Sequence, residues 1–221
     1  RNVVSAAEMG GASAVDVCYN EEIIKMAKEM TSIPVFVSSI VPEELANAVK
    51  LGADAIEVGN FDALYKKGQR ISAENVLEIV NETLRLLNGA KTFICVTVPG
   101  HIDISEQISL AMKLEEMGID LIQTEGAATT TPSNAGARGL LQTAEVSISN
   151  TIELVRNTSI PVMTASGITT TTAPLAIASG ASAIGVGSCI NKLNSPIAMV
   201  AVVKSLVESL NIATKKQMQN V

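Results

Sequence analysis

The chain has 221 residues, a formal net charge of −6 at pH 7 and a pI of about 4.9, with 2% aromatic residues and no tryptophan. A nucleic acid is therefore not expected as a partner, because binding one requires clustered Lys and Arg or aromatic stacking platforms. No apolar run reaches the roughly 18 residues of a membrane span, and the length suits one domain over residues 1–221 with a sizeable core.

Helices and short strands alternate along the first half of the chain. The pattern predicts helices over residues 3–10, 21–30, from Pro42 onwards and over 73–87, and strands over 13–19, 33–39, 55–59 and 92–98. A polar loop over residues 60–72 carries Lys66, Lys67 and Arg70, cations that are either solvated or within reach of an anionic ligand.

The second half continues in the same way. Asp103 and Glu106 resemble a capping box for a helix that ends at Met117. Strands follow at 121–125, 162–166 and 183–187, and helices up to about residue 157, over 172–179 and from Ser195 onwards. The loop from Ala127 to Gly139 is long enough to serve as a lid.

Two repeats predict a barrel. A glycine-led segment occurs at residues 11–18, 52–59, 118–125 and 180–187; in each copy a Gly and a small or polar step precede a short β-branched run. This pattern is typical of a helix C-cap followed by a buried parallel strand. In addition, residues 32–60 match residues 159–188, which indicates duplicated half-barrels.

The predicted fold class is α/β, a (βα)8 TIM barrel. Only seven strands are predicted and the chain opens inside a helix, so we expect the first strand to lie upstream of this sequence. An open, doubly wound sheet is the alternative, and the repeated halves favour the barrel.

Strand alternation predicts which side chains point into the barrel. The inward positions of the four glycine-led segments place Asp16, Glu57, Gln123 and Gly185 in one layer. Burying a carboxylate without a partner is costly, so these acids are either satisfied by neighbouring polar groups or functional. Glu57 and Glu125 are the best candidates for a general acid/base or for ligands of a divalent metal.

Small residues at the end of the chain predict a phosphate site. Ser166 and Gly167 follow the penultimate strand, and Gly187 and Ser188 close the last one. Glycine lets the backbone approach a ligand, and barrels commonly bind phosphate at these two loops. The alternative is that small residues merely fit the taper of the barrel.

The remaining candidates are scattered over the predicted strand ends. His101, the single histidine, lies just past a strand and is either an acid/base group or a solvated loop residue. Further residues expected to line the site are Asp16, Asn60, Thr97, Gln123, Arg138, Asn191 and Lys192. The three cysteines are interpreted as reduced thiols, and no lysine lies at a strand end to form a Schiff base.

Six segments together resemble the hypothetical chloroplast reading frame twenty-three family of plastids and cyanobacteria, a domain of unknown function. They are residues 58–62, 97–99, 122–126, 163–167, 185–188 and 190–194. The resemblance covers nearly the whole chain and implies an aldolase-type TIM barrel, a plastid-stromal or cyanobacterial cytoplasmic location, and a further N-terminal segment that carries the first strand.

Three functions remain open from the sequence. The first is a lyase or isomerase acting on a phosphorylated small molecule, with Glu57 or Glu125 moving protons. The second is an oxidoreductase dependent on flavin mononucleotide, and the third is a non-catalytic ligand-binding or regulatory barrel. The cofactor, whether flavin or a divalent metal, stays undecided, and a homo-oligomer is one expectation for partners.

Overall fold

The computed structural model describes residues 1–65, 67–126 and 132–219. Its seven strands form one parallel sheet in the order of the sequence. They are β1 (Val15–Cys18), β2 (Val35–Ser39), β3 (Ala55–Val58), β4 (Phe93–Val98), β5 (Leu121–Thr124), β6 (Val162–Thr164) and β7 (Ala183–Ile184).

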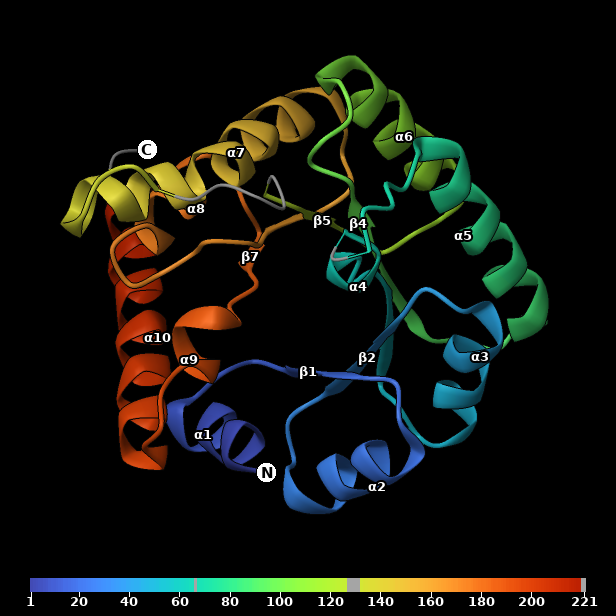
Figure 1. Cartoon of the computed structure of the whole chain (residues 1–221), viewed down its shortest axis with the longest axis horizontal. Coiled ribbons are helices and arrows are strands. Elements are labelled where there is room, and N and C mark those ends of the chain that lie inside the picture. Colours follow the sequence, from blue (N-terminus) through green and yellow to red (C-terminus); the bar gives the residue numbers. More distant parts are fainter. Residues whose placement is uncertain (66, 127–131, 220–221) are drawn as a thin grey trace.

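Helices follow the strands, and the long ones form the outer layer of the molecule (Figure 1). The long ones are α1 (Asn2–Gly10), α2 (Glu21–Met30), α3 (Pro42–Lys50), α5 (Ala73–Leu87), α6 (Ile104–Glu116), α7 (Gly136–Asn157) and α10 (Pro196–Gln219). Three shorter ones are α4 (Asp62–Tyr65), α8 (Ala173–Ala178) and α9 (Ser188–Asn191).

The sheet curls into a TIM barrel with seven strands, one fewer than a closed eight-stranded barrel. Within the described residues β1 and β7 are its two edges. Helices α1 and α10 lie side by side outside the interval between these edges (Figure 1). The sequence prediction of a barrel lacking one strand is therefore confirmed.

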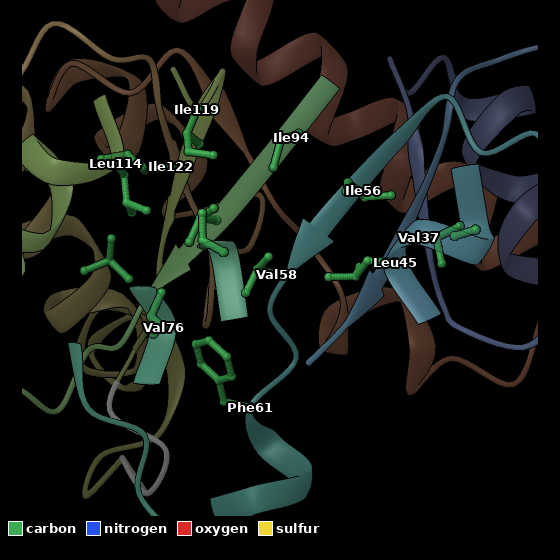
Figure 2. Close-up of a cluster of buried hydrophobic side chains, with 14 of the residues drawn as sticks. Val37, Leu45, Ile56, Val58, Phe61, Val76, Ile94, Leu114, Ile119 and Ile122 are labelled. Carbon is green, nitrogen blue, oxygen red and sulfur yellow. The ribbon is translucent and has the colours of Figure 1, made fainter. Parts of the chain in front are cut away.

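The main core lies between the sheet and the helices. The β-branched residues of the glycine-led segments pack there: Ile56, Val58 and Ile122 are fully buried, together with Leu45 and Phe61 (Figure 2). A second, smaller core cluster forms around α8 and α10 and contains several alanines, among them Ala173 and Ala176.

The four leading glycines adopt the backbone conformation that their position requires. Gly11, Gly52, Gly118 and Gly180 have φ of 85°, 92°, 77° and 96°, a left-handed region that favours glycine. Each one turns the chain from a helix into the next strand, so the repeat reports a real structural unit.

The polar step of two segments has a further role. The Asp54 carboxylate accepts a hydrogen bond from the Val35 backbone N–H at 2.8 Å, while the Asp54 N–H donates to the Val35 carbonyl at 3.0 Å. Asp120 makes the same pair of contacts with Ile94, at 2.8 and 3.1 Å. These aspartates thereby join the start of one strand to the start of its neighbour.

Several expectations about element ends need correction. Asp103 is the N-cap residue of α6, but its side chain makes no capping hydrogen bond, so the predicted capping box is wrong. A real capping box occurs at Ser72 and Asn75, at the start of α5. The last two strands are shorter than predicted, since β6 ends at Thr164 and β7 at Ile184.

The loop from Ala127 to Gly139, predicted as a lid, lies partly outside the described residues, as does Lys66. Its described end, from Gly136, forms the first turn of α7. Among the helices that the structure describes, none is long and apolar enough to cross a membrane.

Candidate functional site

A cavity of about 1410 Å³ opens inside the curled sheet. Its wall contains residues of all seven strands, among them Asp16, Ser38 and Glu57. It also extends along the interval between β1 and β7, where Val3 of α1 and Val203 and Leu206 of α10 form an apolar side. The cavity is therefore polar at the barrel centre and apolar towards the unpaired edges.

Glu57 is the centre of a buried hydrogen-bond network. Its side chain rises from β3, and its Oε1 accepts from the Thr97 hydroxyl at 3.0 Å and from the Gln123 amide at 2.8 Å. The Gln123 amide also lies 3.0 Å from the Thr97 hydroxyl. The residue is only 5% exposed, so three neighbouring strands hold one carboxyl in place by paired polar groups.

Glycine makes room for this network. A side chain at Gly59, two residues after Glu57 on the same face of the strand, would overlap the Glu57 carboxyl and the Thr97 hydroxyl. A Cβ at Gly185 would come within 3.1 Å of the Gln123 side-chain oxygen. The small residues of the inner layer thus leave the space that the larger polar side chains occupy.

Two carboxyl groups of the interior, Asp16 and Glu57, influence each other electrostatically. Burial raises the pKa of Glu57, and the bonds from Thr97 and Gln123 oppose this shift only in part. Burial also raises the pKa of Asp16, which Glu57 raises further by like-charge repulsion, while the Ser38 hydroxyl, 3.0 Å away, lowers it. The two acids therefore titrate as a pair that retains a proton more readily than isolated carboxyls do.

Asp16 differs from Glu57 in its access to solvent. Its side chain lies deep in the molecule but is exposed to the open cavity, since β1 is an edge strand. Water in the cavity reduces the desolvation of Asp16, so Glu57 is the acid of the two that is better shielded from solvent.

Burial raises the pKa of the Cys95 thiol, and Glu57 and Asp16 raise it further. Cys95 is thus held as a protonated thiol in the same interior. Cys18 is exposed and Cys189 is half-buried, and all three cysteines are free thiols.

Glu125 lies at the mouth of the cavity, two residues beyond Gln123. Its Oε2 accepts from the Tyr65 hydroxyl at 2.6 Å and from the Gly100 N–H at 3.3 Å. A side chain at Gly100 would overlap the Glu125 backbone carbonyl, so glycine permits the close approach. Tyr65 comes from α4, a turn that lies inside the ring of helices (Figure 1).

The loops after β6 and β7 line the opposite part of the cavity. Ser166 and Gly167 have φ of 71° and 75°, and the Ser166 carbonyl accepts from the Ser147 hydroxyl at 3.0 Å. A side chain at Gly167 would overlap the Thr143 carbonyl of α7. Gly187 precedes α9 and has open space beside it, since the nearest atom to an added Cβ lies 3.9 Å away.

The cavity wall brings together most of the residues predicted from the sequence. These are Asp16, Glu57, Asn60, Thr97, Gln123, Glu125, Ser166, Gly167, Gly187, Ser188 and Asn191. His101, Arg138 and Lys192 are exposed and are not part of this wall.

Sequence reasoning missed two polar residues of this region, Ser38 and Tyr65. Tyr65 falls in the predicted polar loop, and its one signal is that it is one of two tyrosines in an aromatic-poor chain. Ser38 follows β-branched residues on β2, at a position that alternation assigns to the interior. For metals, no group of three or more His, Cys, Asp or Glu side chains is arranged around one point in the part of the chain that the structure describes.

Comparison with known proteins gives a family match. A family model described as "Protein of unknown function (DUF561)" matches residues 1–216. The uncharacterized protein ycf23 of Cyanophora paradoxa is 36% identical over 213 residues, which cover 96% of this chain and 86% of the relative. Ycf23 of Pyropia yezoensis is 35% identical over 200 residues, 90% of this chain and 72% of the relative.

Solved structures show the same fold at low sequence identity. A 3-hexulose-6-phosphate synthase from Salmonella typhimurium matches with a TM-score of 0.66 and 14% identity, over 91% of this chain and 88% of that protein. A thiamine phosphate pyrophosphorylase from Pyrococcus furiosus matches with a TM-score of 0.58 and 20% identity, over 96% and 89%. At such identities the likeness concerns the fold alone.

Proposed function

Because the chain belongs to the DUF561 family, whose curated relatives carry the name ycf23, we propose its function from the geometry of its own site. The protein binds a phosphorylated small molecule in the cavity and catalyses proton transfer on it, as a lyase or an isomerase. The observation that carries this proposal is that one cavity wall contains both the buried Glu57 carboxyl and the open backbone at Gly187.

The loops after β6 and β7 are the anchor for the phosphate. The positive φ at Ser166 and Gly167 turns that loop sharply, and the space beside Gly187 leaves the backbone N–H groups near Ser188 accessible. Backbone N–H groups and a hydroxyl are suitable donors for an anion. The matched phosphate-ester enzymes support this placement by analogy of fold.

Glu57 supplies the acid. A carboxyl whose pKa is raised by burial keeps its proton at a higher pH than a solvated one, and can therefore donate it to a substrate oxygen. Glu125, at the mouth, is the partner base in this scheme. The acid and the base then lie at different depths of one cavity, which suits a reaction that adds a proton at one atom and removes it from another.

Ligand binding tests the anchor. A thermal-shift screen should find that phosphosugars stabilise the protein and their dephosphorylated forms do not; the shift should be roughly 5–10 °C at a hundredfold excess over Kd. Gly187→Asp puts a negative charge into the open space and should abolish the shift. Ala90→Asp adds the same charge at an exposed position in the turn before β4, at the opposite end of the barrel; it is the control and should retain the shift.

Proton transfer is tested in D2O with the ligands found in that screen. Deuterium should enter the carbon skeleton of a true substrate, and Glu57→Gln or Glu125→Gln should slow this exchange by about 10²–10⁴-fold. A protein that binds phosphosugars without any exchange would be a binding barrel. A protein purified with stoichiometric flavin absorbance would instead support the oxidoreductase alternative, and both outcomes would overturn the lyase or isomerase proposal.

We also propose the plastid stroma, or the cytoplasm of a cyanobacterium, as the location of this activity. The proposal rests on the ycf23 relatives.

A further inference from the structure

Three side chains form a continuous path from the surface to the cavity. His101 is exposed in the turn after β4, and its Nδ1 lies 3.4 Å from the Tyr65 hydroxyl. That hydroxyl lies 2.6 Å from Oε2 of Glu125, which lines the cavity. The middle residue is thus in contact with an acid on the inside and with a base on the outside.

The surroundings hold the middle ring in a defined orientation. The Tyr65 and His101 rings pack edge to face, with centroids 5.5 Å apart and an interplanar angle of 85°. The Tyr65 ring also packs at 62° against the fully buried Phe61. On its face lies the Arg70 guanidinium, 4.9 Å from the centroid. Such contacts restrict the ring, so the hydroxyl stays between Glu125 and His101.

We propose that His101, Tyr65 and Glu125 form a proton relay that exchanges protons between solvent and the cavity. In one state the Tyr65 hydroxyl donates to the Glu125 carboxylate and accepts from the protonated Nδ1 of His101. In the other state the Glu125 carboxyl is protonated and donates to the Tyr65 oxygen, whose hydroxyl donates to the unprotonated Nδ1. When Glu125 has taken a proton as the base, the relay runs from the second state to the first, releases that proton to solvent through His101 and restores the Glu125 carboxylate.

The proton balance is simple. Going from the first state to the second, the N–H bond of His101 breaks and an O–H bond forms at Tyr65, while the original Tyr65 O–H bond breaks and one forms at Oε2 of Glu125. One proton moves inward in total, and Tyr65 is unchanged. The 3.4 Å separation on the outer side is longer than an ordinary hydrogen bond, so this contact must shorten when the proton moves.

The groups that face His101 favour release of its proton. Burial lowers the pKa of His101, the Arg70 guanidinium lowers it further, and a hydrogen bond to the Ile71 backbone opposes both. Among the described residues the other titratable groups on this side are the Tyr65 hydroxyl from α4 and, beyond it, the Glu125 carboxyl from β5. A histidine with a lowered pKa exchanges its proton readily with neutral solvent.

The role assigned to the relay rests on the proposed function, because the relay is useful only if Glu125 moves protons. The coupling between Glu125 and His101 through the Tyr65 hydroxyl can nevertheless be measured without a substrate. The chain has one histidine and two tyrosines, so the His101 ring nitrogens give a single set of signals in 15N NMR. Glu125→Gln removes a negative charge and should lower the pKa of His101. In the Tyr65→Phe background the same substitution should have less than half of this effect.

Tyr19→Phe is the matched control, because the Tyr19 hydroxyl accepts from the Asn47 amide at 2.8 Å on the side of the barrel near α3. It should leave the influence of Glu125→Gln on His101 unchanged. The relay would be overturned if Glu125→Gln changed the pKa of His101 by the same amount in the parent and in the Tyr65→Phe background, or if it changed that pKa in neither.

A second measurement covers the case in which Tyr65→Phe does not fold. In the Tyr19→Phe protein, 3-fluorotyrosine labels position 65 alone and makes that hydroxyl more acidic. The His101 titration should then shift from that of the unlabelled protein, and an unchanged titration would overturn the relay. Coupling without phosphosugar binding would leave the relay standing and overturn the proposed function, and binding without coupling would do the reverse.

Discussion

At the residue scale, the buried carboxyl of Glu57 has the largest consequence for stability and its pH dependence. It is a carboxyl with two hydrogen-bond donors, Thr97 and Gln123, and within the part of the chain that the structure describes no cation bonds to it. It is 5% exposed and is influenced by a second acid, Asp16. Both neighbours, Thr97 and Gln123, favour the ionised form, yet burial outweighs them and raises the pKa. The folded protein therefore keeps a proton that the unfolded chain releases near its ordinary pKa of about 4.3.

Glu57→Gln should therefore change the pH dependence of stability. Below about pH 4 the Glu57 carboxyl is neutral in the folded and in the unfolded protein, so it does not change the free energy of folding. As the pH rises towards the raised pKa, only the unfolded chain releases the proton, and folding becomes less favourable. The amide avoids this cost, so the variant should become increasingly more stable than the parent as the pH rises above about 4. Chemical denaturation at several pH values measures the difference.

Glu22→Gln, at an exposed position of α2, is the control and should show no such trend. If the free energy of unfolding of Glu57→Gln fell relative to that of the parent as the pH rises, this would contradict a raised pKa at Glu57.

At the scale of elements, the glycine-led segments do more than mark helix ends. In two copies the polar step is an aspartate that closes a ring of two hydrogen bonds with a residue at the start of the preceding strand, Val35 or Ile94. For Asp54, burial raises the pKa, but the Lys28 contact at 2.6 Å and the Val35 N–H lower it by more. The segment therefore sets both the turn and the register of the strand that follows.

Asp54→Ala and Asp120→Ala should each destabilise the protein by about 1–3 kcal/mol, because a partly buried backbone N–H loses its acceptor. Urea denaturation at neutral pH measures this loss. Asp103→Ala is the matched control: its side chain makes no capping bond, so the change should stay within about 0.5 kcal/mol. Equal losses at all three positions would show that the bridging bonds contribute nothing specific.

At the scale of the whole molecule, the two sides of the barrel are unequal. The side around β3 and β4 belongs to the larger core cluster, and these strands have neighbours on both sides. The side around β7, α8 and α10 rests on the smaller, alanine-containing cluster, and β7 is a two-residue edge strand. We propose that residues 1–221 form one domain that is nevertheless less stable on the β7 side.

Amide hydrogen exchange should reveal this difference. Exchange should be slowest in β3 and β4 and faster in β7 and α8, since local opening there breaks fewer apolar contacts. A saturating phosphosugar should slow exchange in the loops at Gly167 and Gly187 if the proposed anchor is correct. Uniform protection along all seven strands would contradict an uneven barrel.

Much of the fold could be predicted because it depends on local pattern. The positive φ of Gly11 and Gly118 and the burial of Ile56 and Ile122 follow from short-range chemistry: a left-handed turn needs glycine, and a strand packed under helices needs β-branched side chains. The short helices α4 and α9 were missed, because one turn of helix has no periodicity of its own.

The candidate site was predictable only as a set of inward positions. Alternation places Glu57 and Gln123 on one face of their strands. It does not predict that the Gln123 amide comes within 2.8 Å of the Glu57 carboxyl. Tyr65 could not be found, because its contact with Glu125 joins positions 60 residues apart through a turn that local pattern does not predict.

The sequence by itself determined the repeated strand–helix unit, the parallel barrel and the family to which the chain belongs, since these follow from periodicity and from motifs that neighbouring residues form. Only the tertiary structure decided which polar groups meet: Glu57 with Thr97 and Gln123, and Glu125 with Tyr65 and, through it, His101. The physical reason is that pKa values and proton paths depend on contacts across strands and on burial, and both arise only when the sheet curls.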